Sequence, residues 1–168
     1  IPSPQATAAM NTAIALAIHR RAGDTRPAVV VLSDATSCRV RQIAAAFGAG
    51  VFEVETGEIN VVTAMRDLEL RDRRAVVGVE GPNGGTVFAG TTCRDGTLVG
   101  AGALLAAADP ELRAIIAGTL APGRAMAPGL AGFIEVLPAQ RWFMEKRAAP
   151  ADWATTVTRL DREFPRAF

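Results

Sequence analysis

The chain has 168 residues, of which 49% are hydrophobic and 21% are charged, and its formal net charge is +1. This balance is typical of a globular protein and excludes an intrinsically disordered chain. The arginines are scattered rather than clustered, so we expect neither a nucleic-acid partner nor a membrane partner.

The cysteines, the apolar run near the start and the opening residues indicate the setting in which the chain occurs. Cys38 and Cys93 stand alone in the sequence, without the paired spacing of a zinc site or a disulfide framework. We therefore predict a reducing, cytoplasmic setting. The longest apolar run near the start, 12–18, is too short to span a bilayer. The opening IPSPQ reads like a linker without a methionine, and we interpret the chain as part of a longer protein.

Strands and helices alternate through the first two thirds of the chain. A helix is predicted over 5–21, and a strand buried on both faces over 28–32, where the sequence is AVVVL. A helix ending near Gly48, a strand over 51–54 and a helix beginning at Gly57 follow. Strands over 75–79 and 86–88 precede a very apolar helix over 96–108. The pattern predicts an α/β fold, a three-layer α/β/α sandwich with a mostly parallel four-stranded sheet.

Beyond Ala108 the pattern weakens, and prolines punctuate the sequence. Helices are predicted over 110–118 and 151–162. We place a domain boundary near Asp109, which separates a domain over 1–108 from a partly helical C-terminal segment over 109–168.

The turns that follow the predicted strands carry most of the candidate polar residues. They are Ser33–Ser37, Glu55–Asn60 and Glu80–Gly85. Right-handed crossovers between parallel strands bring such turns to one edge of the sheet, where ligands of α/β sheets bind.

The loop EGPNGG, Glu80 to Gly85, places one carboxylate beside several glycines. Glycines at the tip of a strand bare backbone N–H groups, and a neighbouring carboxylate can accept hydrogen bonds from two sugar hydroxyls. The plainer interpretation is a tight turn between two strands, with Asn83 and Gly84 forming a hairpin and Glu80 solvated. The glycine spacing matches neither a dinucleotide fingerprint nor a phosphate-binding loop of the Gly-Lys-Ser/Thr type.

Two further acidic residues have a plain structural interpretation. Glu58 stands in the first turn of a helix, where a carboxylate complements the helix dipole. Asp95 precedes an apolar helix and is predicted to cap it. His19, beside two arginines at a helix end, is expected to be solvated.

Four motifs taken in order resemble the third domain of the α-D-phosphohexomutase family, which includes phosphoglucomutases and phosphomannomutases. They are VVLSDATS, VETGEINVVTAM, VVGVEGPNGGTVF and CRDGTLVGAGALL. The loop resembles the family's sugar-recognition loop, whose forms are G-E-x-S-G-H and G-E-G-N-G-G. In this sequence Pro82 lengthens the loop by one residue. Gly85 stands where many members have a histidine. Ala35 stands where several members have a lysine, and Glu58 stands where some have a histidine.

The resemblance implies a mutase that moves phosphate between C1 and C6 of a hexose phosphate through a phosphoserine, with Mg²⁺ and a hexose bisphosphate activator. The substrate-binding residues that it implies are Glu58, Glu80, Gly81, Asn83, Gly84 and Gly85. No catalytic residue and no metal ligand is assigned, because the phosphoserine loop and the metal loop belong to domains that this sequence does not contain. We therefore expect a sugar-recognition domain that is inactive alone and has the other domains of its parent chain as partners. The alternative is a non-enzymatic sugar-phosphate or nucleotide-binding module.

Overall fold

The structure is a computed structural model and describes residues 2–139. Its first elements are α1 (Pro4–Ala22), β1 (Ala28–Ser33), α2 (Cys38–Phe47), β2 (Gly50–Val54) and α3 (Glu58–Leu70). They are followed by β3 (Arg74–Glu80), β4 (Gly85–Phe88), α4 (Gly96–Ala108), α5 (Pro110–Leu120) and α6 (Leu130–Val136). The predicted strands and helices through 108 are all present, with ends that differ by no more than one residue.

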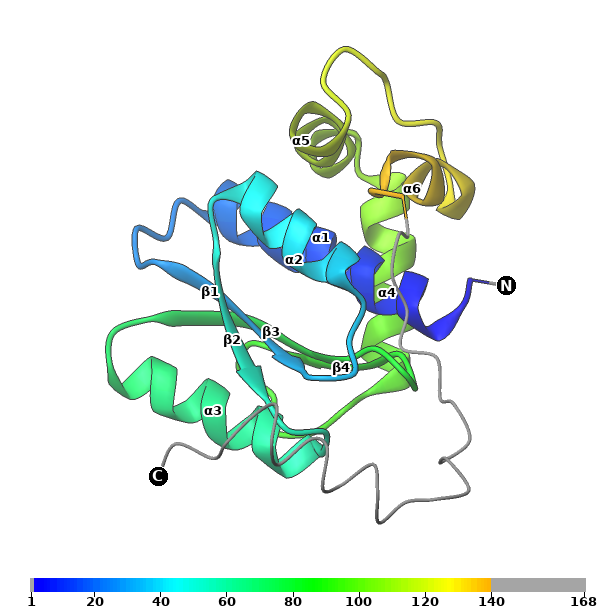
Figure 1. The fold of residues 1–168 in the computed structure, drawn as a ribbon. Coiled ribbons are helices and arrows are strands. Elements are labelled where there is room, and N and C mark those ends of the chain that lie inside the picture. Colours follow the sequence, from blue (N-terminus) through cyan, green and yellow to red (C-terminus); the bar gives the residue numbers. More distant parts are fainter. Residues whose placement is uncertain (1, 140–168) are drawn as a thin grey trace, which may run out of the picture.

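The four strands form one sheet in the order β2-β1-β3-β4. β1 is parallel to β2 and to β3, whereas β4 runs antiparallel to β3. α1 and α2 cover one face and α3 covers the other (Figure 1). The predicted three-layer α/β/α sandwich with a mostly parallel sheet is confirmed.

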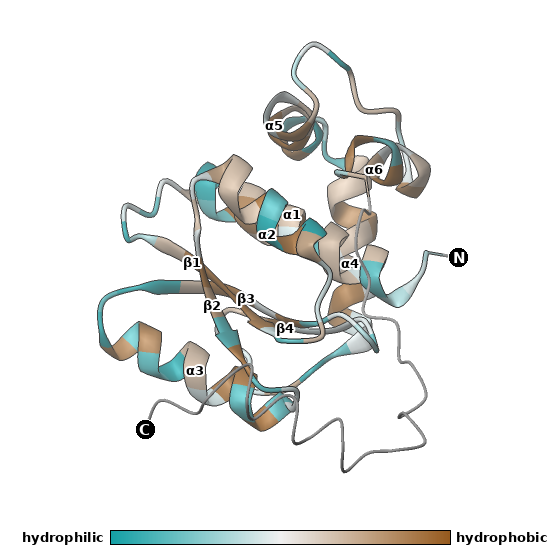
Figure 2. Cartoon of the chain, viewed as in Figure 1, coloured by the Kyte–Doolittle hydropathy of each residue, from teal (hydrophilic) through white to brown (hydrophobic). Residues whose placement is uncertain are grey.

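The central strand β1 is buried on both faces, as its run of apolar residues predicts. Val30 and Leu32 face α1 and α2, whereas Val31 belongs to the cluster packed under α3. None of the three exposes any surface. The apolar strands lie inside the layers of helices in the hydropathy view (Figure 2).

Helix α1 has more buried residues than any other helix in the described part of the chain. Ser3 caps its start, where the Ser3 hydroxyl accepts from the N–H of Ala6, and Gly23 in the left-handed conformation caps its end. It contacts α2, α4, α5, α6 and the strands β1, β3 and β4. Alanines fill much of its buried surface, so neighbouring elements can approach its backbone closely.

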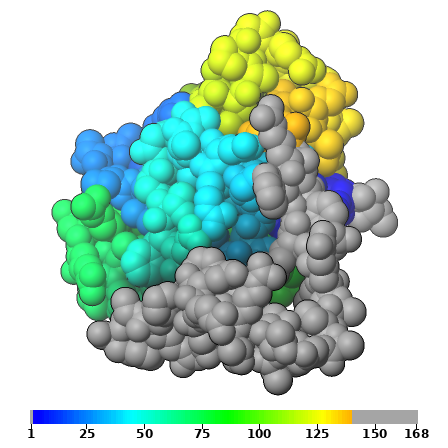
Figure 3. Space-filling view, in the orientation of Figure 1, coloured from blue at the N-terminus to red at the C-terminus, as the bar shows by residue number. Residues whose placement is uncertain are grey.

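Helices α5 and α6 lie above α1 and α2, and α6 was not predicted from the sequence. Leu112, Ile116 and Phe133 expose no surface and belong to the same core cluster as the side chains of α1. Residues 110–139 gather on one side of the molecule in the space-filling view (Figure 3). The boundary at Asp109 stays a prediction about folding. The helix predicted over 151–162 lies outside the described residues.

The very apolar helix α4 packs against α1 and leaves Leu98, Leu104 and Leu105 partly exposed. In the part of the chain that the structure describes, no helix is both long enough and apolar enough to cross a membrane.

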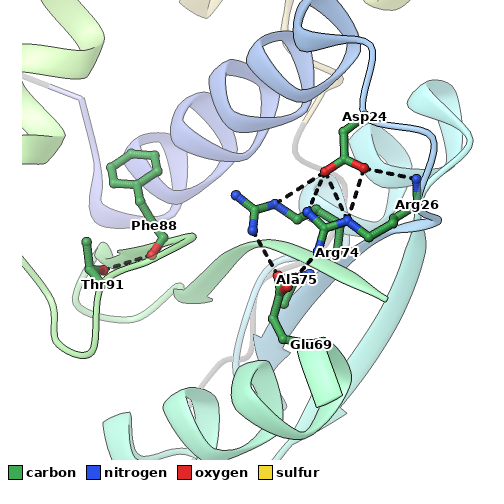
Figure 4. A network of polar contacts seen from close by, with 7 residues as sticks. All are labelled: Asp24, Arg26, Glu69, Arg74, Ala75, Phe88 and Thr91. Atoms are coloured by element: carbon green, nitrogen blue, oxygen red, sulfur yellow. Dashed lines mark hydrogen bonds and ion pairs between the residues drawn. The ribbon is translucent and has the colours of Figure 1, made fainter. Parts of the chain in front are cut away.

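A network of ion pairs ties the loop after α1 to the end of α3 and the start of β3 (Figure 4). Arg26 binds Asp24 at 2.6 Å and Glu69 at 3.0 Å, and Arg74 binds Glu69 at 3.2 Å. The Glu69 carboxylate also accepts from the backbone N–H of Ala75. The hydrogen bond from Arg26 is the main reason that the pKa of Asp24 lies far below its usual range. This network lies at the amino ends of the parallel strands and fixes that end of the sheet.

Candidate functional site

The carboxyl ends of β1, β2 and β3 meet at one edge of the sheet because these strands are parallel. The first two loops are joined there by Asp34, whose Oδ1 accepts from the hydroxyl of Thr56 at 2.7 Å. The N–H of Asp34 also donates to the carbonyl of Val54. The hydrogen bond from Thr56 is the first cause that lowers the pKa of Asp34. The predicted meeting of the loops at one edge is therefore present.

Gly81 joins the third loop to the first. Its N–H donates to the hydroxyl of Thr36 at 3.0 Å. A side chain at position 81 would overlap the carboxamide of Gln5. That carboxamide accepts from the N–H of Ser37 and donates to the carbonyl of Ala35. The glycine therefore makes room for α1 to bind the loop after β1.

The loop from Glu80 to Gly85 is a hairpin between antiparallel strands, as its plainer interpretation predicts. Gly84 has a φ of 69°, a left-handed conformation that glycine adopts without strain. The side-chain oxygen of Asn83 accepts from the N–H of Gly85 at 2.7 Å. Pro82 and Asn83 are exposed at the tip.

Glu80 is not solvated, in contrast to what that plainer interpretation expects. The residue is only 4% exposed. Its Oε1 accepts from the N–H of Gly57 at 2.9 Å, and its Oε2 lies 2.9 Å from Nη1 of Arg94. The amide of Asn83 approaches Oε2 at 3.5 Å. A buried carboxylate is stable only when it is paired and hydrogen-bonded, and these contacts meet that condition.

Glu58 lies beside this carboxylate and shares its cation. Oε1 of Glu58 accepts from the backbone N–H of Arg94, and Oε2 accepts from its Nε, both at 2.8 Å. These hydrogen bonds, the backbone one first, hold the pKa of Glu58 below its usual range. Glu58 also stands in the first turn of α3, so the predicted favourable placement at the helix dipole remains valid.

Arg94 is the site residue that sequence reasoning missed. The sequence places it beside Asp95, whose predicted capping role is confirmed by hydrogen bonds from the N–H groups of Thr97 and Leu98. The side chain of Arg94 reaches over Gly85, where an added Cβ would overlap Cδ of Arg94. The signal available in the sequence was the motif RDG, in which only the aspartate was assigned a role, as a helix cap.

The predicted site residues are therefore brought together, except Gly81, which binds Thr36. Glu58, Glu80, Asn83 and Gly85 surround Arg94 or contact its partners, and Gly84 forms the turn between them. Among residues 2–139, no three histidine, cysteine, aspartate or glutamate side chains gather in a way that could hold a metal ion. The cluster can accept and donate hydrogen bonds, but it does not provide a ligand set for Mg²⁺.

The mostly parallel sheet, with a hairpin at the carboxyl ends of its parallel strands and helices on both faces, defines an α/β/α domain. The family model described as phosphoglucomutase/phosphomannomutase, alpha/beta/alpha domain III, matches residues 9–119. The chain belongs to this family. The resemblance inferred from the four motifs is thereby confirmed.

Among solved structures, the chain is similar to a putative phosphomannomutase from Thermus thermophilus. The two are 19% identical with a TM-score of 0.46, and the match covers 76% of this chain and 24% of the other. This chain thus spans about a quarter of the length of that protein. No curated protein matches the sequence.

Proposed function

We propose that this chain is the sugar-recognition domain of a phosphohexomutase, an enzyme that moves phosphate between C1 and C6 of a hexose phosphate through a phosphoserine. The observation that carries the proposal is the cluster at the hairpin, where Glu80, Asn83 and Arg94 gather beside the exposed tip of the loop. Membership of the mutase family supports it.

The charge of the site edge favours hydroxyl groups over phosphate as the part of the ligand bound there. Four carboxylates lie at this edge, after the strands or at the start of α3: Asp34, Glu55, Glu58 and Glu80. Arg94 lies among them and is paired with Glu58 and Glu80. Carboxylates accept hydrogen bonds from sugar hydroxyls and repel phosphate. In this proposal the phosphate groups are bound by other domains of the parent chain.

Catalysis would likewise depend on the other domains. The phosphoserine, the Mg²⁺ ion and the use of a hexose bisphosphate activator are assigned to the parent enzyme, where the metal would offset charge on the transferred phosphoryl group. We keep the cytoplasmic setting as part of the proposal, since Cys38 and Cys93 are both free thiols. The chain alone should show no mutase activity with glucose 1-phosphate or mannose 1-phosphate, Mg²⁺ and a bisphosphate activator.

The domain's role in binding can be tested on the chain itself. Mannose 1-phosphate and glucose 1-phosphate are titrated into the ¹⁵N-labelled protein, with the amide signals of Gly57, Gly84 and Gly85 as reporters. Saturable shifts at these signals are expected. Glu80→Gln should weaken binding about tenfold or more, because each charge-assisted hydrogen bond contributes about 1.5–3 kcal/mol.

Glycerol 3-phosphate is the matched control ligand, since it offers the phosphate without the sugar ring. It should shift these signals far less than either hexose phosphate at the same concentration. Equal shifts from glycerol 3-phosphate, or hexose-phosphate shifts confined to other parts of the domain, would overturn the proposal.

A further inference from the structure

Three residues from separate segments are arranged around the Glu80 carboxylate. Glu58 comes from α3, Gly85 from the start of β4, and Arg94 from the loop before α4. Glu58 and Gly85 both constrain Arg94, and Arg94 is the cation that faces Glu80.

Glu58 holds Arg94 at two points. One carboxylate oxygen binds its backbone N–H and the other binds Nε, both at 2.8 Å. Two points of attachment fix both the loop and the plane of the guanidinium group, which a single contact would leave free to rotate. With Nε bound, Nη1 is directed to Oε2 of Glu80 at 2.9 Å.

Gly85 supplies the space for this arrangement. A Cβ at position 85 would overlap Cδ of Arg94 and would lie 2.7 Å from Oδ1 of Asn83. Position 85 does not have a positive φ, so its backbone does not require glycine. The side chain of Arg94, together with that of Asn83, is therefore the reason that no larger residue fits.

The Glu80 carboxylate depends on Arg94 more than Arg94 depends on it. The side chain of Glu80 is 5% exposed, whereas that of Arg94 is 38% exposed. A buried carboxylate that loses its cation is left uncompensated, but an exposed guanidinium can turn to water.

We propose that Glu58 is a positioning residue for this site: it orients Arg94 through two hydrogen bonds, Gly85 leaves the space for the arginine, and Arg94 then holds Glu80 in its binding geometry. The proposal rests on the proposed function, because it concerns how the sugar-recognition cluster is kept in order. It gives Glu58 a role that acts through Arg94 and not through contact with the sugar.

The experiment is a mutant cycle on the full 168-residue chain. Wild type, Glu58→Ala, Glu58→Gln, Arg94→Ala and the double variant Glu58→Ala/Arg94→Ala are titrated with mannose 1-phosphate and glucose 1-phosphate by NMR. The Nε–H signal of Arg94 reports the orientation of its guanidinium group. Melting temperatures identify variants that bind poorly because they unfold.

Glu58→Ala is expected to weaken binding at least tenfold and to remove the protected Nε–H signal. Glu58→Gln should recover part of both, because its remaining oxygen can still accept one hydrogen bond. In the Arg94→Ala background, Glu58→Ala should change binding less than twofold. Gly85→Ala should weaken binding in the wild-type background and much less so in the Arg94→Ala background.

Glu53→Ala is the matched control. Glu53 on β2 pairs with Arg41 on α2 at 2.6 Å, so this variant removes a comparable Glu–Arg pair away from the hairpin. Its binding should equal that of wild type.

The outcomes separate the two proposals. A wild-type chain that binds neither hexose phosphate refutes the proposed function and the positioning role that rests on it. If wild type binds while Glu58→Ala binds equally well and keeps the Nε–H signal, the positioning proposal alone is refuted. Independent, additive losses from Glu58→Ala and Arg94→Ala refute it as well.

Discussion

Gly78 lies in the middle of β3 and allows α3 to approach the sheet. A Cβ at this position would overlap Cγ1 of Val61 and would lie 2.7 Å from Sδ of Met65. Both neighbours are buried, at 1% and 6% exposure, so neither can move into water. Gly78→Ala should therefore strain the contact between α3 and the sheet.

The size of the effect follows from two opposing contributions. Overpacking a core costs about 1–3 kcal/mol. Alanine restricts the unfolded chain more than glycine does, which returns about 0.4–1 kcal/mol. The net expectation for Gly78→Ala is a loss of about 1–2 kcal/mol in the free energy of unfolding. For a chain of this length that corresponds to a fall in Tm of about 2–8 °C.

Thermal unfolding followed by circular dichroism measures this loss, with Gly100→Ala as the control. Gly100 lies in α4, and a Cβ there would have no atom within 4 Å. That variant should gain about 0.4–1 kcal/mol, because alanine favours the helix and restricts the unfolded state. In a Val61→Ala background, Gly78→Ala should destabilise the protein much less, since the new methyl group enters the vacated space and only the close contact with Met65 remains. A Gly78→Ala protein as stable as wild type would refute the reasoning about close packing.

Three other predictions concern the ion-pair network, the core and the loop. Because Asp24 has a lowered pKa, its ionised carboxylate stabilises the folded protein fully above about pH 5, and this contribution is lost as the pH falls below about 4. Asp24→Asn should therefore lose less stability than wild type between pH 5 and pH 2. Equal losses in acid unfolding would contradict this. Phe133→Ala should cost about 3–5 kcal/mol in denaturant unfolding, because the ring is fully buried in the common core; a cost below 1 kcal/mol would instead favour a domain that ends near Asp109. Gly81→Ala should cost about 1–2 kcal/mol by displacing Gln5 from two hydrogen bonds, and this cost should vanish in a Gln5→Ala background.

Local sequence patterns sufficed for the fold through residue 108. The continuous apolar run at 28–32 identified β1 as a central strand, since only a strand covered on both faces tolerates such a run. The aspartate before an apolar helix identified the start of α4 at Gly96. Both signals lie within a few residues of the structure that they predict.

The site required contacts that no local pattern contains. Glu58 and Arg94 are 36 residues apart and meet only because α3 begins, and the loop before α4 ends, at the same edge of the sheet. The burial of Glu80 depends on that meeting, so its carboxylate was expected in water under the plainer interpretation. Helix α6 was missed for a related reason: its seven residues, Leu130–Val136, are too few to show a helical period, and it is held by packing of Phe133.

The enclosed position of α1 has a consequence during synthesis of the chain. α1 leaves the ribosome before the strands and helices that bury it. The last elements that contact it are α5 and α6, which end at Leu120 and Val136. At about 5–20 residues per second, the roughly 100 residues between α1 and the end of α5 take on the order of 5–20 s to translate. Throughout that interval the segment that forms α1 has only part of its native contacts. The native packing of α1 can therefore be completed only after the last residues of α6 have left the ribosome.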